Sequence, residues 1–145
     1  MDPLFLPGEL DSLGPIGRYV LDAATAAGLD RSTAYKLRLA VDEIATNAVI
    51  HGYQEGNISG QVVVSATIDD GALTIAVEDT ARPFDPAARA LPSEEELDLP
   101  LEEREMGGLG VLLAREGVHD FRYERVDGRN RSIFIVHRPT AAVPD

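Results

Sequence analysis

The sequence of 145 residues contains no cysteine. This absence excludes disulfide bonds, zinc sites built on thiolates and thiol catalysis, and it is compatible with a reducing compartment. The sequence has no apolar run long enough to cross a bilayer, and its first residues, Met1 to Pro7, hold no basic residue and no apolar segment of secretory length. We therefore expect a soluble, cytoplasmic protein.

Basic residues are scarce: 13 Lys and Arg stand against 25 Asp and Glu, which gives a formal net charge of -12. Such a charge repels both a nucleic-acid backbone and an anionic membrane. We expect no direct nucleic-acid partner and no membrane partner, and a basic protein surface suits the chain better. The length corresponds to one domain, and the 44% of apolar residues are sufficient for a core.

Apolar periodicity and turn residues predict the order of helices and strands. Residues 3 to 10 form at best a brief edge strand, and Asp30 or Ser32 caps the second helix, which stops at Gly52. The pattern predicts an α/β (α+β) two-layer sandwich, in which a mixed, mostly antiparallel sheet has the helices on one face. The predicted helices are 12–27, 31–51 and 109–116, and the predicted strands are 61–69, 72–79, 120–126 and 131–137.

The second predicted helix carries Glu43, Asn47 and His51 at intervals of four residues. Because a helix has about 3.6 residues per turn, these side chains lie in a line along one face. A carboxylate that accepts a proton, one turn before a carboxamide whose oxygen is a hard ligand, suits a Mg-nucleotide site. An amphipathic surface helix with an ordinary polar face shows the same stripe, so the stripe alone does not decide.

Asp79 has the same parity in its predicted strand as Leu73, Ile75 and Val77. A carboxylate therefore stands at the end of a buried row, where a charge is costly unless something pairs with it. The alternative is a strand-end Asp that turns into solvent or caps a turn.

The segment from Thr80 to Met106 contains four prolines and the acidic run Glu94-Glu95-Glu96. A loop of this length is usually functional or disordered, and a solvated acidic linker is the simpler interpretation. Gly107-Gly108-Leu109-Gly110 follows and leads directly into an apolar stretch that resembles a helix start. Glycines allow close approach of an anion, and a helix N-terminus favours negative charge, but such a turn is a weak signal alone.

In this order, the features resemble the GHKL (Bergerat-fold) ATP-binding domains, and within them the anti-sigma-factor serine kinases typified by RsbW and SpoIIAB. The stretch from Asp42 to Tyr53 is similar to the N box of that family nearly throughout. The segments Asp79 to Pro86 and Gly107 to Gly110 are similar to its G1 and G2 boxes. The resemblance covers roughly residues 8 to 138 and implies one histidine-kinase-like ATPase domain over residues 1–145.

The resemblance implies a role for each matched residue. Asn47 would bind Mg²⁺ through its side-chain oxygen, and Glu43 would orient and deprotonate the attacking hydroxyl. Asp79 would accept a hydrogen bond from the exocyclic amine of adenine. The amides around Gly108 and Gly110 would hold phosphate oxygens. A lid over the nucleotide would span about 82–106.

The resemblance also places an arginine against the transferred phosphoryl group. Arg104 or Arg82 fits this role, and we favour Arg104 because it lies beside the glycines. Ser132 would make at most an indirect contact near adenine. The same boxes assign to the nucleotide site Ala81, Phe84, Gly107 and Leu109, whereas surface or packing roles fall to His51, Arg129 and Arg131.

One departure from the family pattern is Ala81, because the G1 box usually reads Asp-x-Gly. Glycine there usually serves a positive φ or a close backbone approach to the ligand. Alanine in the left-handed region costs on the order of 1 kcal/mol. If the whole cost falls on the bound state, ATP binding is weakened roughly five- to tenfold.

The resemblance implies an anti-sigma factor that is also a protein serine/threonine kinase. It would use Mg-ATP to phosphorylate a STAS-domain anti-anti-sigma factor, and it would hold a sigma factor or similar target. The alternative is a non-catalytic nucleotide-binding or sequestration module, which Ala81 favours and the pair Glu43 and Asn47 disfavours. The catalytic domain of a histidine kinase ranks below both, because neither early helix has the length or a central exposed histidine.

Similar proteins are often dimers, so the resemblance also implies a homodimer. The second face of the predicted sheet is less apolar than the first, and a partner copy would cover part of it. That face carries Val63, Ser65, Thr67, Thr74 and Ala76.

Overall fold

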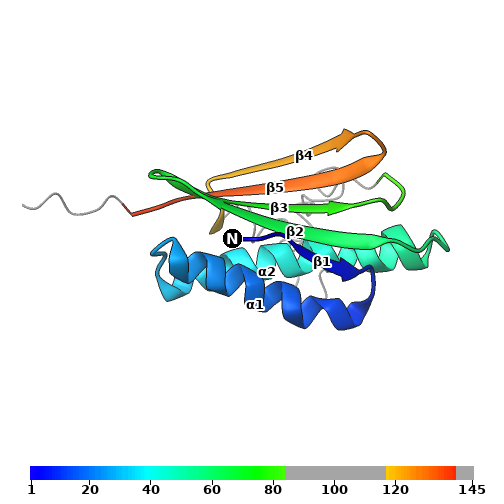
Figure 1. Ribbon diagram of the computed structural model, residues 1–145, viewed down its shortest axis with the longest axis horizontal. Coiled ribbons are helices and arrows are strands. Elements are labelled where there is room, and N and C mark those ends of the chain that lie inside the picture. Colours follow the sequence, from blue (N-terminus) through cyan, green and yellow to red (C-terminus); the bar gives the residue numbers. More distant parts are fainter. Residues whose placement is uncertain (84–116, 140–145) are drawn as a thin grey trace, which may run out of the picture.

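The computed structural model describes residues 1–83 and 117–139. In this part of the chain, two helices lie on one side of a five-stranded sheet (Figure 1). The two-layer α+β fold predicted from the sequence is therefore confirmed. The elements are β1 (Leu4–Pro7), a 3-10 turn (Leu10–Ser12), α1 (Leu13–Ala26), α2 (Arg31–Asn47), a π-helical segment (Ala48–Gln54), β2 (Gln61–Ile68), β3 (Ala72–Asp79), β4 (Asp120–Val126) and β5 (Arg129–His137).

The strand order in the sheet is β1-β2-β3-β5-β4, and every neighbouring pair is antiparallel. The prediction of a mixed sheet is thus corrected for the described strands. Tight turns join β2 to β3 and β4 to β5, and the second turn has positive φ at Asp127 and Gly128. Because β5 pairs with β3, the middle strand of the sheet ends beside the start of β5.

Local signals set the bounds of both helices. The turn after α1 contains Gly28 with a φ of +78°, a value that glycine adopts at little cost. The N-cap of α2 is Asp30, whose side chain accepts a hydrogen bond from the backbone N–H of Thr33 at 2.7 Å. Among residues 1–83 and 117–139, no helix is both long and apolar enough to cross a membrane.

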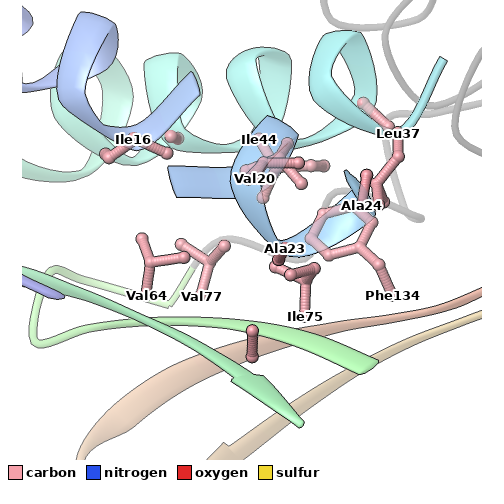
Figure 2. Close-up of a cluster of buried hydrophobic side chains, with 14 of the residues drawn as sticks. Ile16, Val20, Ala23, Ala24, Leu37, Ile44, Val64, Ile75, Val77 and Phe134 are labelled. Carbon is pink, nitrogen blue, oxygen red and sulfur yellow. The ribbon is translucent and has the colours of Figure 1, made fainter. Parts of the chain in front are cut away.

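The core lies between the helices and the sheet, where small side chains of α1 allow a close approach (Figure 2). Ala23 and Ala24 are fully buried there, next to the larger Phe134 of β5. The alternating strand pattern read from the sequence is confirmed, because the predicted inward rows are buried. These rows comprise Val62, Val64 and Ala66 in β2 and Leu73, Ile75 and Val77 in β3.

The second helix does not stop at Gly52. After Asn47 the chain continues in π-helical turns from Ala48 to Gln54, and the N–H of Glu55 donates to the carbonyl oxygen of Ile50 at 2.9 Å. A π-helix widens each turn and is often found at functional sites. The prediction of a helix end at Gly52 is therefore wrong, and a residue that usually ends helices lies inside one here.

Tyr53 connects the π-helical segment to the sheet. Its side chain is 2% exposed, and its hydroxyl donates to the carbonyl oxygen of Gln61 at 2.6 Å. The same hydroxyl accepts from the N–H of Thr80 at 2.9 Å, directly after β3. The π-helical segment is thereby held against the start of β2 and the end of β3.

We expect Tyr53→Phe to lower the free energy of unfolding by about 1–3 kcal/mol, because it leaves the partly buried N–H of Thr80 without its acceptor. Urea denaturation followed by circular dichroism measures the change. The matched control is Tyr35→Phe, because Tyr35 is 52% exposed; its effect should stay within about 0.5 kcal/mol. Equal effects of the two substitutions would contradict the role given to the Tyr53 hydroxyl.

The face of the sheet away from the helices is less apolar than the core face, as predicted. Thr67 is exposed, and Val63, Ser65 and Thr74 are half-buried. Ala76 differs from this description, because it is only 4% exposed. β1 adds Phe5 to this face, since Phe5 pairs with Val63, and its side chain is 61% exposed.

Candidate functional site

A pocket lies where the C-terminal part of α2 and the π-helical segment meet the end of β3 and the start of β5. Three residues of the predicted nucleotide site, Asp79, Ala81 and Ser132, line it together. Sequence positions more than 50 residues apart are therefore brought to one place. The complete lining is Ile44, Ala48, Gly52, Asp79, Ala81, Arg82, Asn130 and Ser132.

Asp79 is the buried acid of this pocket, with only 7% of its surface exposed. Its Oδ1 accepts hydrogen bonds from Nδ2 of Asn130 at 2.8 Å and from the N–H of Ala81 at 3.0 Å. Burial raises the pKa of the Asp79 carboxyl, and the hydrogen bonds from Asn130 and Ala81 and the charge of Arg125 act in the opposite direction. The Asp79 side chain thus caps the turn after β3, and it is buried while it does so.

Ala81 does not have the strained backbone that the missing glycine suggested. In the described part of the chain, the only non-glycine residues with positive φ are Asn57 and Asp127. The expected cost of a left-handed alanine, and the weaker ATP binding derived from it, therefore lose their basis. Ala81 is 1% exposed, and a Cβ added at Gly52 would lie 2.6 Å from the Cβ of Ala81. The absence of a side chain at Gly52 thus lets the π-helical segment approach Ala81 closely.

Glu43 and Asn47 lie on α2, one turn apart, just before the π-helical segment. Asn47 is 6% exposed, and Oε1 of Glu43 is buried with no hydrogen-bond partner among the described residues. Burial raises the pKa of the Glu43 carboxyl, and the nearby His51 partly opposes this effect. A buried acceptor without a partner is costly, so this oxygen suits a donor that a ligand would bring.

Asp42 shares one of these properties, since its Oδ1 is also buried without a partner within the described ranges. Its other oxygen, Oδ2, lies 3.5 Å from Nε of Arg38, one turn earlier on the helix. Burial raises the pKa of the Asp42 carboxyl, while Arg38 lowers it. Asp42 thus forms an ion pair with Arg38, whereas Glu43 is in no ion pair within residues 1–83 and 117–139.

Arg82 points its guanidinium at the π-helical segment. Its Nε donates to the carbonyl oxygen of His51 at 2.9 Å, and its Nη2 lies 3.2 Å from Oε2 of Glu55. These contacts occupy the side chain, so the structure gives no support to Arg82 as the group that faces a transferred phosphoryl. Arg129 and Arg131 pair with Glu78 at 3.7 and 3.2 Å in surface contacts, in agreement with their predicted surface role.

Several predicted site residues lie outside the described residues, and their roles stay predictions. They belong to the predicted lid, of which only Arg82 and Pro83 are described, and to the glycine-rich turn and the helix expected at 109–116. These residues are Phe84, Arg104, Gly107, Gly108, Leu109 and Gly110.

Asn130 and Arg125 are site residues that the sequence analysis missed. Asn130 is 4% exposed and contacts Asp79, and Nη1 of Arg125 donates to the carbonyl oxygen of Ala81 at 3.1 Å. Strand parity contained the signal for Asn130, because Asn130 and Ser132 lie on the same face of β5. Arg125 carries no such signal, since charged residues on an edge strand usually face solvent.

The described residues fit a nucleotide with a divalent cation. The cation would depend on Asn47 and on phosphate oxygens, because the described residues contain no group of three or more His, Cys, Asp or Glu that could hold a metal. The Asp79 carboxylate offers a buried acceptor for an amino group of a base. The unpartnered oxygen of Glu43 offers an acceptor for the proton of a hydroxyl.

Comparison with known proteins identifies relatives of this chain. The family model described as a histidine kinase-like ATPase domain matches residues 6–135. An anti-sigma F factor from Clostridium acetobutylicum is 30% identical over 109 residues, which are 75% of this chain and 72% of the relative. An anti-sigma F factor from Heyndrickxia coagulans is 54% identical over 43 residues, 29% of each chain.

Solved structures with low sequence identity share the fold. A chain in the crystal structure of the SiaB-SiaC complex from Pseudomonas aeruginosa aligns with a TM-score of 0.63 at 13% identity, and the alignment covers 94% of this chain and 89% of that one. The histidine kinase domain of the blue-light activated kinase EL346 from Erythrobacter litoralis aligns with a TM-score of 0.53 at 19% identity, covering 87% and 59%.

We expect Gly52→Ala to lower the free energy of unfolding by about 1–3 kcal/mol, because the new methyl group would overlap that of Ala81. In the Ala81→Gly background the same substitution should cost less by about 1 kcal/mol or more. Chemical denaturation of the four proteins of this double-mutant cycle measures the coupling.

Gly71→Ala is the control for the loss of a glycine, since a Cβ there meets only an ordinary contact at 3.8 Å. It should be nearly neutral in both backgrounds. Additive effects of Gly52→Ala and Ala81→Gly would show that the two residues do not share the space.

Proposed function

The chain belongs to the histidine kinase-like ATPase domain family, and on that premise we propose that it is a Mg-ATP-dependent protein serine/threonine kinase of the anti-sigma-factor type. The observation that carries the proposal is Oε1 of Glu43, which is buried, has no hydrogen-bond partner among the described residues and lies one turn before Asn47. Neither residue lines the pocket at Asp79, but their chain neighbours Ile44 and Ala48 do. A hydroxyl that gives up its proton would supply the partner that this oxygen lacks among the described residues.

In this proposal each residue has one task. Asp79 accepts a hydrogen bond from the adenine amino group, and Asn47 holds the Mg²⁺ ion. Glu43 takes the proton of an attacking serine or threonine hydroxyl, while the oxygen of that hydroxyl forms a bond to the γ-phosphorus of ATP and the bond from this phosphorus to the ADP oxygen breaks. Asn47 would hold a Mg²⁺ ion, which would supply positive charge beside the phosphate oxygens. Arg104 and the glycine-rich turn from Gly107 to Gly110 complete the phosphate site in this proposal.

The substrate in this proposal is a STAS-domain anti-anti-sigma factor, and the second target is a sigma factor or similar protein. The support is the similarity to two proteins named anti-sigma F factor. The formal net charge of -12 suits a basic target surface and raises the rate of association with it. Phosphorylation of the STAS-domain protein would then determine whether this chain binds the sigma factor or similar target.

We also propose a homodimer through the sheet face away from the helices. The support is an apolar strip across three strands of this face: Phe5 of β1 is 61% exposed, and Val63, Ile133 and Ile135 are half-buried. An exposed strip of this kind is common at protein interfaces. The kinase proposal also includes one ATPase domain over residues 1–145 and a lid over the nucleotide at about 82–106.

A sequestration module that binds nucleotide without catalysis is the second candidate. Its support was the alanine in place of a glycine, and the absence of positive φ at Ala81 weakens that support. The histidine kinase interpretation stays below both, because the likeness to the Erythrobacter domain concerns the fold alone.

The kinase proposal predicts that Glu43→Gln lowers phosphoryl transfer by about a hundredfold or more, since the amide cannot accept the hydroxyl proton. The assay uses ATP labelled at the γ-phosphate, Mg²⁺ and the STAS-domain proteins of the source organism. ATP affinity, measured by calorimetry, should change little. The matched control is Asp22→Asn on the exposed side of α1, which should transfer at the wild-type rate. Full transfer by Glu43→Gln would remove Glu43 from the mechanism.

The raised pKa of Glu43 predicts a second property of the same variant. Between the unfolded and the folded pKa the folded state binds more protons, so this group lowers stability as pH rises through that window. We therefore expect Glu43→Gln to be more stable than wild type at pH 7 and to lose this advantage below the unfolded pKa. Thermal unfolding at several pH values tests it, and an unchanged difference between the two proteins across pH would contradict it.

A further inference from the structure

Asn130 occupies the centre of a polar cluster at the end of the sheet. It pairs directly with Asp79 in the register between β3 and β5. Its side chain is 4% exposed, so each of its polar atoms depends on protein partners. Nothing in the family resemblance assigned a role to this residue.

The amide nitrogen of Asn130 binds the acid and the chain that follows it. Nδ2 donates to Oδ1 of Asp79 at 2.8 Å, to the carbonyl oxygen of Ala81 at 3.2 Å and to that of Arg82 at 3.0 Å. One side chain therefore joins the carboxylate at the end of β3 to the second and third residues of the segment that leads away from the sheet.

The amide oxygen of Asn130 fixes the orientation of the group. It accepts a hydrogen bond from the hydroxyl of Tyr123 and another from Nη1 of Arg125 at 3.0 Å. A flipped amide would set its oxygen against the Asp79 carboxylate and its nitrogen against two donors. Tyr123 and Arg125 thus ensure that Asn130 presents a donor to Asp79.

This arrangement divides the two oxygens of Asp79. Within the described residues, both hydrogen bonds to the carboxylate end on Oδ1, from Asn130 and from Ala81. Oδ2 is left as the acceptor for a ligand in the pocket that Asp79 lines. A carboxylate with one saturated oxygen and one free oxygen recognises a donor and repels an acceptor.

We propose that Asn130 is a positioning residue that holds Asp79 for base recognition, so that the pocket selects a nucleobase with an amino group over one with a carbonyl at the same place. This inference rests on the proposed nucleotide site and adds the source of its selectivity. Burial raises the pKa of the Asp79 carboxyl, and loss of Asn130 would remove the hydrogen bond that most opposes this effect. A protonated Asp79 would no longer distinguish the two kinds of base.

The test compares ATP with inosine triphosphate, which carries a carbonyl group in place of the adenine amino group. Calorimetry on wild type and on Asn130→Leu, a substitution of similar size, gives the ratio of the two dissociation constants. We expect a ratio of about tenfold or more in wild type and below about threefold in Asn130→Leu. The control is Thr67→Ala, which removes an exposed polar group of β2 outside the pocket and should keep the wild-type ratio.

A merely structural role for Asn130 would weaken both ligands equally and leave the ratio unchanged, which would overturn the inference. If Asn130→Leu does not fold, Tyr123→Phe takes its place, because it removes one of the two donors that orient the amide. Tyr123→Phe should lower the ratio by a smaller factor than Asn130→Leu, and an unchanged ratio would again overturn the inference.

The two proposals can fail separately. If wild type binds neither triphosphate, the proposed nucleotide site itself fails. If wild type binds both with a ratio that no variant alters, only the role of Asn130 fails.

Discussion

A carboxylate buried at the end of the middle strand is the constraint on which the rest of the site depends. Asp79 continues the inward row of β3, and a charge in that position requires donors. Asn130 from β5 and the N–H of Ala81 supply them, and the same contacts fix the backbone that follows β3. The pocket is therefore shaped by the requirement to satisfy one acid, and its other walls come from α2 and the π-helical segment.

If Glu43 is the proposed proton acceptor, stability and activity act against each other on α2. The burial that raises the pKa of Glu43 makes the ionised group costly in the folded protein, and the same burial makes its oxygen a better proton acceptor. The cost is tolerated because α2 packs on the sheet through residues such as Leu37 and Ile44 (Figure 2). Tyr53 then holds the end of that helix at the edge of the pocket.

The sequence predicted the elements that have a strong period or a strong turn signal. Strand alternation placed Asp79 in a buried row, and the turn at Asp127 and Gly128 set the hairpin of β4 and β5. The π-helical segment was missed, because its wider turns have no distinct pattern and Gly52 resembles a helix end. The conformation of Ala81 was misjudged from the family pattern, since the close approach belongs to Gly52. Asn130 was missed because its partner depends on the register between β3 and β5, which parity alone does not give.

The central claim is that Asp79, Asn47 and Glu43 form a Mg-nucleotide site. The most direct measurement is a calorimetric titration of the purified protein with ATP, with and without Mg²⁺. We expect Mg²⁺-dependent binding in the micromolar range, which is about -8 kcal/mol at a dissociation constant of 1 μM. No binding up to millimolar ATP would contradict it and would leave a protein that regulates a partner by contact alone.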